Sequence, residues 1–109
     1  MNGYLDGQWK VVEVSPSPSE ILIKQDLFYN IQLHVCQLTY YAGYFIDGKI
    51  EYDGDNLMID FPYQLTEEQT VKLAQYGILS NPVVFKVEFP TKNTLILSDG
   101  ESRVKLIRF

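Results

Sequence analysis

Apolar and polar residues alternate along most of the chain with a period of two. Successive side chains of a strand point to opposite faces of a sheet, so this period is typical of strands with one buried face. The clearest example is residues 27–38, which we predict to form one strand. Its inward face would carry Leu27, Tyr29, Ile31, Leu33 and Val35, and its outward face Asn30, Gln32 and His34.

The same alternation predicts a strand before this segment. Residues 8–14 favour a strand around Trp9, and Pro16 and Pro18 end it because proline donates no hydrogen bond to a sheet. Residues 21–24 fit either a short strand or part of the connection to the next strand.

Residues 43–52 and 57–61 predict a β-hairpin. Between them lies Asp53-Gly54-Asp55-Asn56, a turn sequence of the kind that joins antiparallel strands. Gly48 falls in the inward row, where the absence of a side chain suits a bulge or a sharp coil of the sheet. The other inward residues would be Tyr44, Ile46, Ile50, Tyr52, Leu57, Ile59 and Phe61.

One helix follows the hairpin. Thr66-Glu67-Glu68-Gln69 has the pattern of a capping box, and two glutamates in the first turn suit the positive end of the helix dipole. Val71 and Ala74, with Leu73 as a further candidate, form a short apolar stripe. Tyr76-Gly77 ends the helix, with the glycine just after the last turn.

The remaining residues predict a three-stranded meander. Residues 83–89, 94–98 and 103–109 alternate, and the turn sequences 90–93 and 99–102 separate them. In the first of these strands, Val83, Phe85, Val87 and Phe89 would point inward.

These elements predict an all-β, mainly antiparallel fold. We expect an up-and-down meander barrel of seven or eight strands, with the short helix inserted after the fourth clear strand. Closure of the sheet removes its two unpaired edges, which is the physical reason to prefer a barrel. The alternative is an open sheet with the helix laid across it.

Length and charge narrow the class of protein. A chain of 109 residues forms a single domain, residues 1–109, and its 46% of hydrophobic residues suffices for one core. Nine basic against 14 acidic residues give a net charge of −5, so nucleic acid is a poor partner. No apolar run is long enough for a transmembrane segment. The single cysteine, Cys36, has no partner for an intrachain disulfide.

Gly7-Gln8-Trp9 resembles the Gly-x-Trp element at the start of the first strand of lipocalin-like, calycin-type proteins. The strand order is also similar to the small lipocalin-like domains of unknown function in exported lipoproteins of gut anaerobic bacteria. The resemblance implies that Trp9 caps the closed end of the barrel. It also implies that an arginine of the last strand packs across Trp9, with Arg108 the first candidate and Arg103 the second.

The resemblance also implies export or a place in the cell envelope. The first residues, Met1 to Asp6, contain neither a basic region nor an apolar one, so the chain as given is no secretory precursor. A trimmed exported protein and a cytoplasmic protein both fit this beginning. The chain departs from full-length lipocalins in its short length, the position of its helix and its lack of a cysteine pair, which weakens the expectation of an open ligand cup.

Three groups of residues invite a chemical interpretation. His34 and Cys36 would share a strand face, but same-face neighbours are about 6.6 Å apart, too far for a nucleophile and its base. Residues 53–56 begin like a calcium loop, but the later ligand positions are not met, so a hairpin turn is the better interpretation. Glu67 and Glu68 are explained by the helix start. We therefore expect no catalytic residue, metal or cofactor.

The aromatic residues are the best candidates for a binding site. Inward aromatic side chains either form an ordinary core or line an apolar cavity whose tyrosine hydroxyls orient a ligand. Separately, the tyrosine-rich connection Tyr40-Tyr41-Ala42-Gly43-Tyr44 suits a barrel rim or a protein contact. The candidate ligand residues are Tyr29, Tyr44, Tyr52, Phe61, Phe85 and Phe89.

Three hypotheses for function follow. The first is a non-enzymatic binding protein that holds a small hydrophobic molecule in the barrel, which requires an internal void. The second is an interaction or structural module of the cell envelope, with a solid barrel that contacts another protein through the tyrosine-rich connection or an open sheet edge. The third, an enzyme, requires a cleft that joins His34, Cys36 and a carboxylate.

Overall fold

Nine strands, one α-helix and a short 3-10 helix make up the described part of the chain. The structure, a computed structural model, describes residues 2–41, 43–62, 64–100 and 102–109, so Ala42 of the tyrosine-rich connection and Glu101 of the last predicted turn lie outside the described residues. The elements are η1 (Gly3–Leu5), β1 (Gly7–Ser15), β2 (Leu22–Ile23), β3 (Leu27–Gln32), β4 (Val35–Tyr40), β5 (Gly43–Tyr52), β6 (Asn56–Asp60), α1 (Glu67–Gln75), β7 (Val83–Thr91), β8 (Thr94–Asp99) and β9 (Ser102–Arg108).

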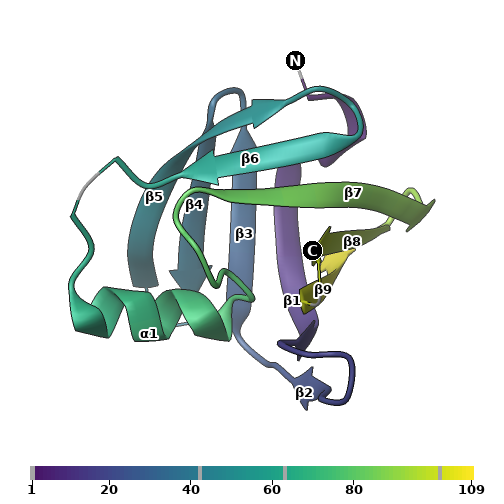
Figure 1. The fold of residues 1–109 in the computed structure, drawn as a ribbon. Helices are drawn as coiled ribbons and strands as arrows, with labels where there is room; N and C mark the ends of the chain where they lie inside the picture. Colours follow the sequence, from purple (N-terminus) through teal and green to yellow (C-terminus); the bar gives the residue numbers. More distant parts are fainter. Residues whose placement is uncertain (1, 42, 63, 101) are drawn as a thin grey trace.

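The sheet is a closed antiparallel barrel (Figure 1). From β3 to β9 each strand pairs with the next one along the chain, and β1 pairs with β3 on one side and with β9 on the other. Trp9 marks the closure, since it lies opposite Tyr29 of β3 and opposite Arg108 of β9. Eight strands form the ring, which confirms the predicted barrel. The short β2 pairs with β1 below the ring.

The single strand predicted over residues 27–38 is wrong. It is two strands, β3 and β4, which pair with each other from Leu27↔Tyr40 to Gln32↔Val35. Leu33 and His34 form the turn between them, and Leu33 has a φ of 54°. Apolar residues continue at positions 33 and 35, so the alternation runs through the turn and hides it. Beyond the turn, Cys36 and Leu38 are the inward residues.

The predicted hairpin is confirmed as β5 and β6, with one slip at its beginning. A bulge shifts the register where Leu38 lies opposite Ile46 and Thr39 lies opposite Tyr44. Phe45 therefore packs against the core, and Tyr44 points outward. Gly48 lies inward at a position with no room for a side chain, since a Cβ there would lie 2.7 Å from Cγ2 of Ile59.

The helix begins and ends as predicted, but one residue of its apolar stripe points the other way. Both bonds of the capping box between Thr66 and Gln69 are present, and Gly77 follows the helix with a φ of 83°. Leu73 is buried, whereas Val71 is exposed. The helix follows β6 and lies across the lower end of the barrel (Figure 1).

Candidate functional site

The barrel interior contains three of the six predicted ligand residues. Tyr29, Phe61 and Phe85 are fully buried, as the alternation predicted. The Tyr29 hydroxyl donates a hydrogen bond to the backbone carbonyl of Tyr76, 2.5 Å away. Burial raises the pKa of Tyr29 well above its ordinary value, so this hydroxyl remains a donor. The one hydrogen that this hydroxyl can donate is therefore already used within the fold.

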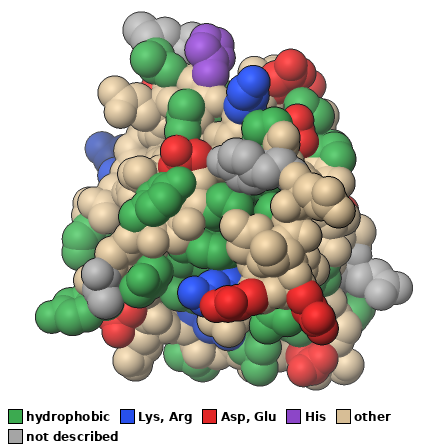
Figure 2. All heavy atoms as spheres, turned by 90° about the vertical axis from the view of Figure 1, so that its left-hand side faces the viewer, with side chains coloured by type: hydrophobic (Ala, Val, Ile, Leu, Met, Phe, Trp, Pro, Cys, Tyr) green, Lys and Arg blue, Asp and Glu red, His purple; other side chains and the backbone are tan. Residues whose placement is uncertain are grey.

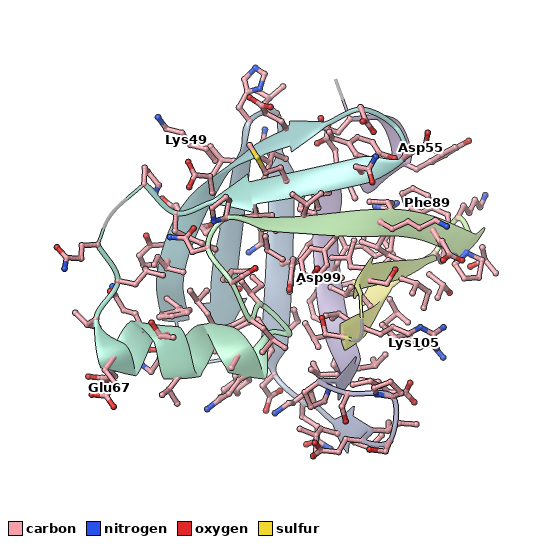
Figure 3. All side chains as sticks on the ribbon, viewed as in Figure 1. Lys49, Asp55, Glu67, Phe89, Asp99 and Lys105 are labelled. Carbon is pink, nitrogen blue, oxygen red and sulfur yellow. The ribbon has the colours of Figure 1, made fainter. Side chains whose placement is uncertain are left out.

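Tyr52 and Phe89 lie near the η1 end of the barrel and are partly buried. The Tyr52 hydroxyl donates to the carbonyl of Gly54 in the β5–β6 turn, 3.1 Å away. The Phe89 ring lies 6.2 Å from the Trp9 ring, and Figure 3 shows Phe89 on β7. Together with Tyr4, both residues line an open depression of about 470 Å³.

Tyr44 is the exception among the six. The bulge between β4 and β5 places its side chain on the outer surface, where it is 52% exposed. The expectation that Tyr44 points into the barrel is therefore wrong, because a single extra residue in one strand exchanges the two faces of the sheet.

The closed end of the barrel has the predicted contact between Trp9 and Arg108. The Arg108 guanidinium carbon lies 4.1 Å from the centre of the Trp9 ring, and the Trp9 indole donates to the carbonyl of Leu5 at 2.9 Å. Arg108 donates to the carbonyls of Asp6 and Tyr4, at 3.0 and 2.6 Å. This fixes η1 across the end of the barrel.

Gly7 is required by the same contact. Its φ is 134°, which side chains rarely adopt, and a Cβ at this position would lie 2.6 Å from Nη1 of Arg108. The glycine of the Gly-x-Trp element therefore leaves space for the guanidinium group of the last strand. Arg103, the second candidate, lies opposite Ser15 and Ser98, away from Trp9.

The other end of the barrel is filled by α1 and the residues after it. Leu73, Tyr76 and Ile78 are buried there. The Tyr76 hydroxyl donates to the carbonyl of Thr39 at 2.8 Å, and its ring stacks on Phe45 with 5.7 Å between ring centres. Burial, with a smaller contribution from Tyr40, raises the pKa of Tyr76 to about 12. Sequence reasoning missed Tyr76 and Phe45, because one ends a helix and the other lies at a bulge.

The interior between these ends is packed with side chains. A Cβ at Gly48 would lie 2.7 Å from Ile59 and 2.9 Å from the ring of Phe61. A Cβ at Gly77 would meet Val104 at 2.1 Å. By contrast, a depression of about 1040 Å³ lies on the outside, open to solvent, over Asn30, Gln37 and Asp47. Available space therefore lies on the outer surface of the barrel.

The described tyrosines of the tyrosine-rich connection, Tyr40, Tyr41 and Tyr44, are exposed to solvent. Tyr41 is 83% exposed and Tyr40 is 40% exposed. The backbone N–H of Tyr41 donates to the carbonyl of Asp26 at 3.0 Å, which ties the end of β4 to the start of β3. We call Tyr40, Tyr41 and Tyr44 the tyrosine surface. Figure 2 shows one face of the molecule, on which hydrophobic side chains occur in small groups among charged and polar ones.

The pairing of His34 and Cys36 on one strand face is wrong. His34 belongs to the exposed β3–β4 turn, whereas Cys36 is buried inside the barrel. Burial raises the pKa of the Cys36 thiol far above its ordinary value, with Asp47 as a smaller cause, and a neutral buried thiol is a poor nucleophile.

Residues 53–56 form the predicted turn. The backbone N–H groups of Asp55 and Asn56 donate to Oδ1 of Asp53, which lowers the pKa of that carboxyl group. Glu68 lies 4.0 Å from Lys72 on the exposed side of α1. Within the described residues, we find no group of three or more His, Cys, Asp or Glu residues arranged to hold a metal ion. The helices in the described ranges are also too short or too polar to cross a membrane.

The family of the chain follows from its match to the model of the lipocalin-like domain, which extends over residues 1–109. The chain belongs to the lipocalin-like domain family. Its structure is similar to a lipocalin-like protein from Bacteroides uniformis, with a TM-score of 0.74 and 19% identity, covering 98% of this chain and 100% of that one. Among curated proteins, we find no significant match.

A second similar structure is an uncharacterized protein from Bacteroides eggerthii. Its TM-score is 0.70 with 14% identity, and the match covers 95% of this chain and 98% of that one. At these identities the two structures support the fold. The lipocalin-like assignment made from Gly7, Trp9 and the strand order is confirmed.

Proposed function

We propose that this lipocalin-like domain is a non-enzymatic interaction module with a solid barrel, and that it binds another protein through the tyrosine surface. The observation that carries the proposal is the packing of the interior, where Tyr29, Phe61 and Phe85 are fully buried and α1 fills one end. A carrier of a hydrophobic molecule needs a pocket of at least about 300 Å³, which this packing does not favour.

The tyrosine surface supports the protein-binding part of the proposal. Tyrosine is enriched at protein interfaces because its ring gives a large contact area and its hydroxyl group stays hydrogen-bonded. Tyr41 and Tyr44 expose more than half of their surface on one connection. The family resemblance extends the proposal to an exported or envelope location, which fractionation of native cells tests.

Titration with apolar probes tests the solid barrel. We expect the wild-type protein to show no saturable 1:1 binding of fatty acids or small aromatic molecules in calorimetry. Phe85→Ala removes a fully buried ring and should create a site for a benzene-sized probe, provided that circular dichroism shows a folded protein. Saturable 1:1 binding to the wild type would contradict the proposal.

Crosslinking in native cells tests the tyrosine surface. A photoreactive residue at position 41 should form an adduct with one defined protein, and the same residue at the exposed position 88 of β7 should not. Tyr44→Ser, introduced together with the label at 41, should weaken the adduct because it removes a neighbouring contact. Equal adducts at 41 and 88, or an adduct that Tyr44→Ser leaves unchanged, would reject this surface.

A further inference from the structure

Strand β2 is a short edge with an apolar surface. It pairs with β1 through Glu13↔Ile23 and Val14↔Leu22. Figure 1 shows it below the barrel, beside the lower end of β1. Ile21, Leu22 and Ile23 are 66%, 41% and 70% exposed. Edge strands of this kind are ready to pair with a further strand.

The pairing with β1 determines which backbone groups point away from the barrel. The N–H of Lys24 donates to the carbonyl of Val12 at 3.0 Å. In an antiparallel ladder the hydrogen-bonding direction alternates, so Leu22 and Lys24 direct their backbone groups toward β1. The N–H and carbonyl groups of Ile21 and Ile23 then point to the free edge, where a further strand would pair.

The charges of this edge match those of a second, antiparallel copy of the same edge. The sequence is Glu20-Ile21-Leu22-Ile23-Lys24, with an acid and a base at equal distances from the central leucine. In an antiparallel pair centred on Leu22, Glu20 of each copy would lie opposite Lys24 of the other. Opposite charges at facing positions of a ladder are stabilising.

We propose that β2 pairs with β2 of a second copy of this chain, about a two-fold axis through Leu22. This register uses the free backbone groups, since Ile21 of each copy exchanges hydrogen bonds with Ile23 of the other. It also places the two leucines and the two Glu–Lys pairs on one face, and the isoleucines on the other. A two-fold pair of identical patches is the commonest form of protein dimer.

The size of the edge determines the strength of the pair. Stable interfaces bury about 1200 Å² or more, and a five-residue edge buries less. We therefore expect a weak, concentration-dependent dimer. The self-complementary charges favour a second copy over an unrelated strand, whose charges would have to match by chance. The inference does not depend on the tyrosine surface.

Sedimentation equilibrium of the full chain with charge-reversed variants tests the pairing. Glu20→Lys and Lys24→Glu each turn both facing pairs into like charges, so each should weaken dimerisation about tenfold. An equimolar mixture of the two variants restores opposite charges at every facing position, and should dimerise as well as the wild type. Glu88→Lys and Lys86→Glu make the same charge changes on exposed sites of β7 and should leave dimerisation unchanged.

Recovery in the mixture cannot come from misfolding, so it would support this register directly. A second measurement locates the contact: the amide signals of residues 20–24 should shift with protein concentration in NMR spectra. A wild-type protein that stays monomeric at millimolar concentration would overturn the inference. So would single variants that dimerise like the wild type, or a mixture that fails to recover.

Discussion

At the scale of single residues, the contact between Trp9 and Arg108 joins the two ends of the chain. It combines a guanidinium group over an indole ring with hydrogen bonds to the carbonyls of Asp6 and Tyr4. Gly7 provides the space for it. The contact could be expected from the sequence because the resemblance of Gly7-Gln8-Trp9 to the Gly-x-Trp element of lipocalin-like proteins implies it. The sequence could not predict the role of the glycine, which depends on a side chain 101 positions later.

Arg108→Ala should lower the free energy of unfolding by about 2 to 3 kcal/mol, because it removes the cation–π contact and leaves backbone carbonyls without their charged donor. Lys105→Ala, three residues earlier on β9, should change it by less than about 0.5 kcal/mol. Urea unfolding followed by Trp9 fluorescence measures both values. Equal small losses in the two variants would contradict the role of Arg108.

Leu33 occupies the left-handed region of the backbone, with a φ of 54°. This conformation costs a non-glycine residue about 1 kcal/mol or more. Because the side chain is half exposed, Leu33→Gly should stabilise the protein by up to about 1 kcal/mol, measured as an increase in the urea midpoint. Leu33→Ala, which keeps the Cβ and removes the rest of the side chain, is the control and should show no such gain.

At the scale of elements, α1 closes the end of the barrel opposite Trp9. Its start was predictable, because the capping box of Thr66 and Gln69 is a local pattern. Its inward side was predictable only in part. Leu73 belongs to the apolar stripe and is buried, but Tyr76, which ends the helix, packs against Tyr29 and Phe45, which lie far away in the sequence. The β3–β4 turn was missed for a related reason: apolar residues continue through it.

Tyr76 makes the closure of this end sensitive to alkaline pH. An unfolded tyrosine ionises near pH 10, whereas the pKa of Tyr76 in the fold is about 12. The folded state therefore holds the Tyr76 proton more tightly than the unfolded state does. The resulting contribution to the free energy of unfolding is complete below pH 10 and is lost as the pH rises toward 12. At pH 11 the loss should be about 1 kcal/mol.

Urea unfolding at pH 9 and pH 11 measures this change. Tyr76→Phe cannot ionise, so its stability should fall less over the same interval, although it starts lower because the hydrogen bond to Thr39 is lost. A variant with the same pH dependence as the wild type would show that Tyr76 does not contribute. Tyr29 is present in both proteins, so its ionisation affects the comparison only through the small part by which Tyr76 raises the pKa of Tyr29.

At the scale of the whole molecule, the barrel is closed and its interior is occupied. The class of fold was predictable from period-two alternation, because half-buried strands need a common core. The sequence could not predict whether the barrel contains a cavity, because that depends on how Phe61, Phe85 and Gly48 share the same space. The outward position of Tyr44 depends in the same way on one bulge.

Native mass spectrometry of protein purified from its own source, with solvent extraction of the same sample, tests the solid barrel most directly. We predict the mass of the polypeptide without an apolar molecule, at monomer or dimer stoichiometry. An apolar molecule bound to each chain at 1:1, and retained through purification, would contradict the account and favour a carrier.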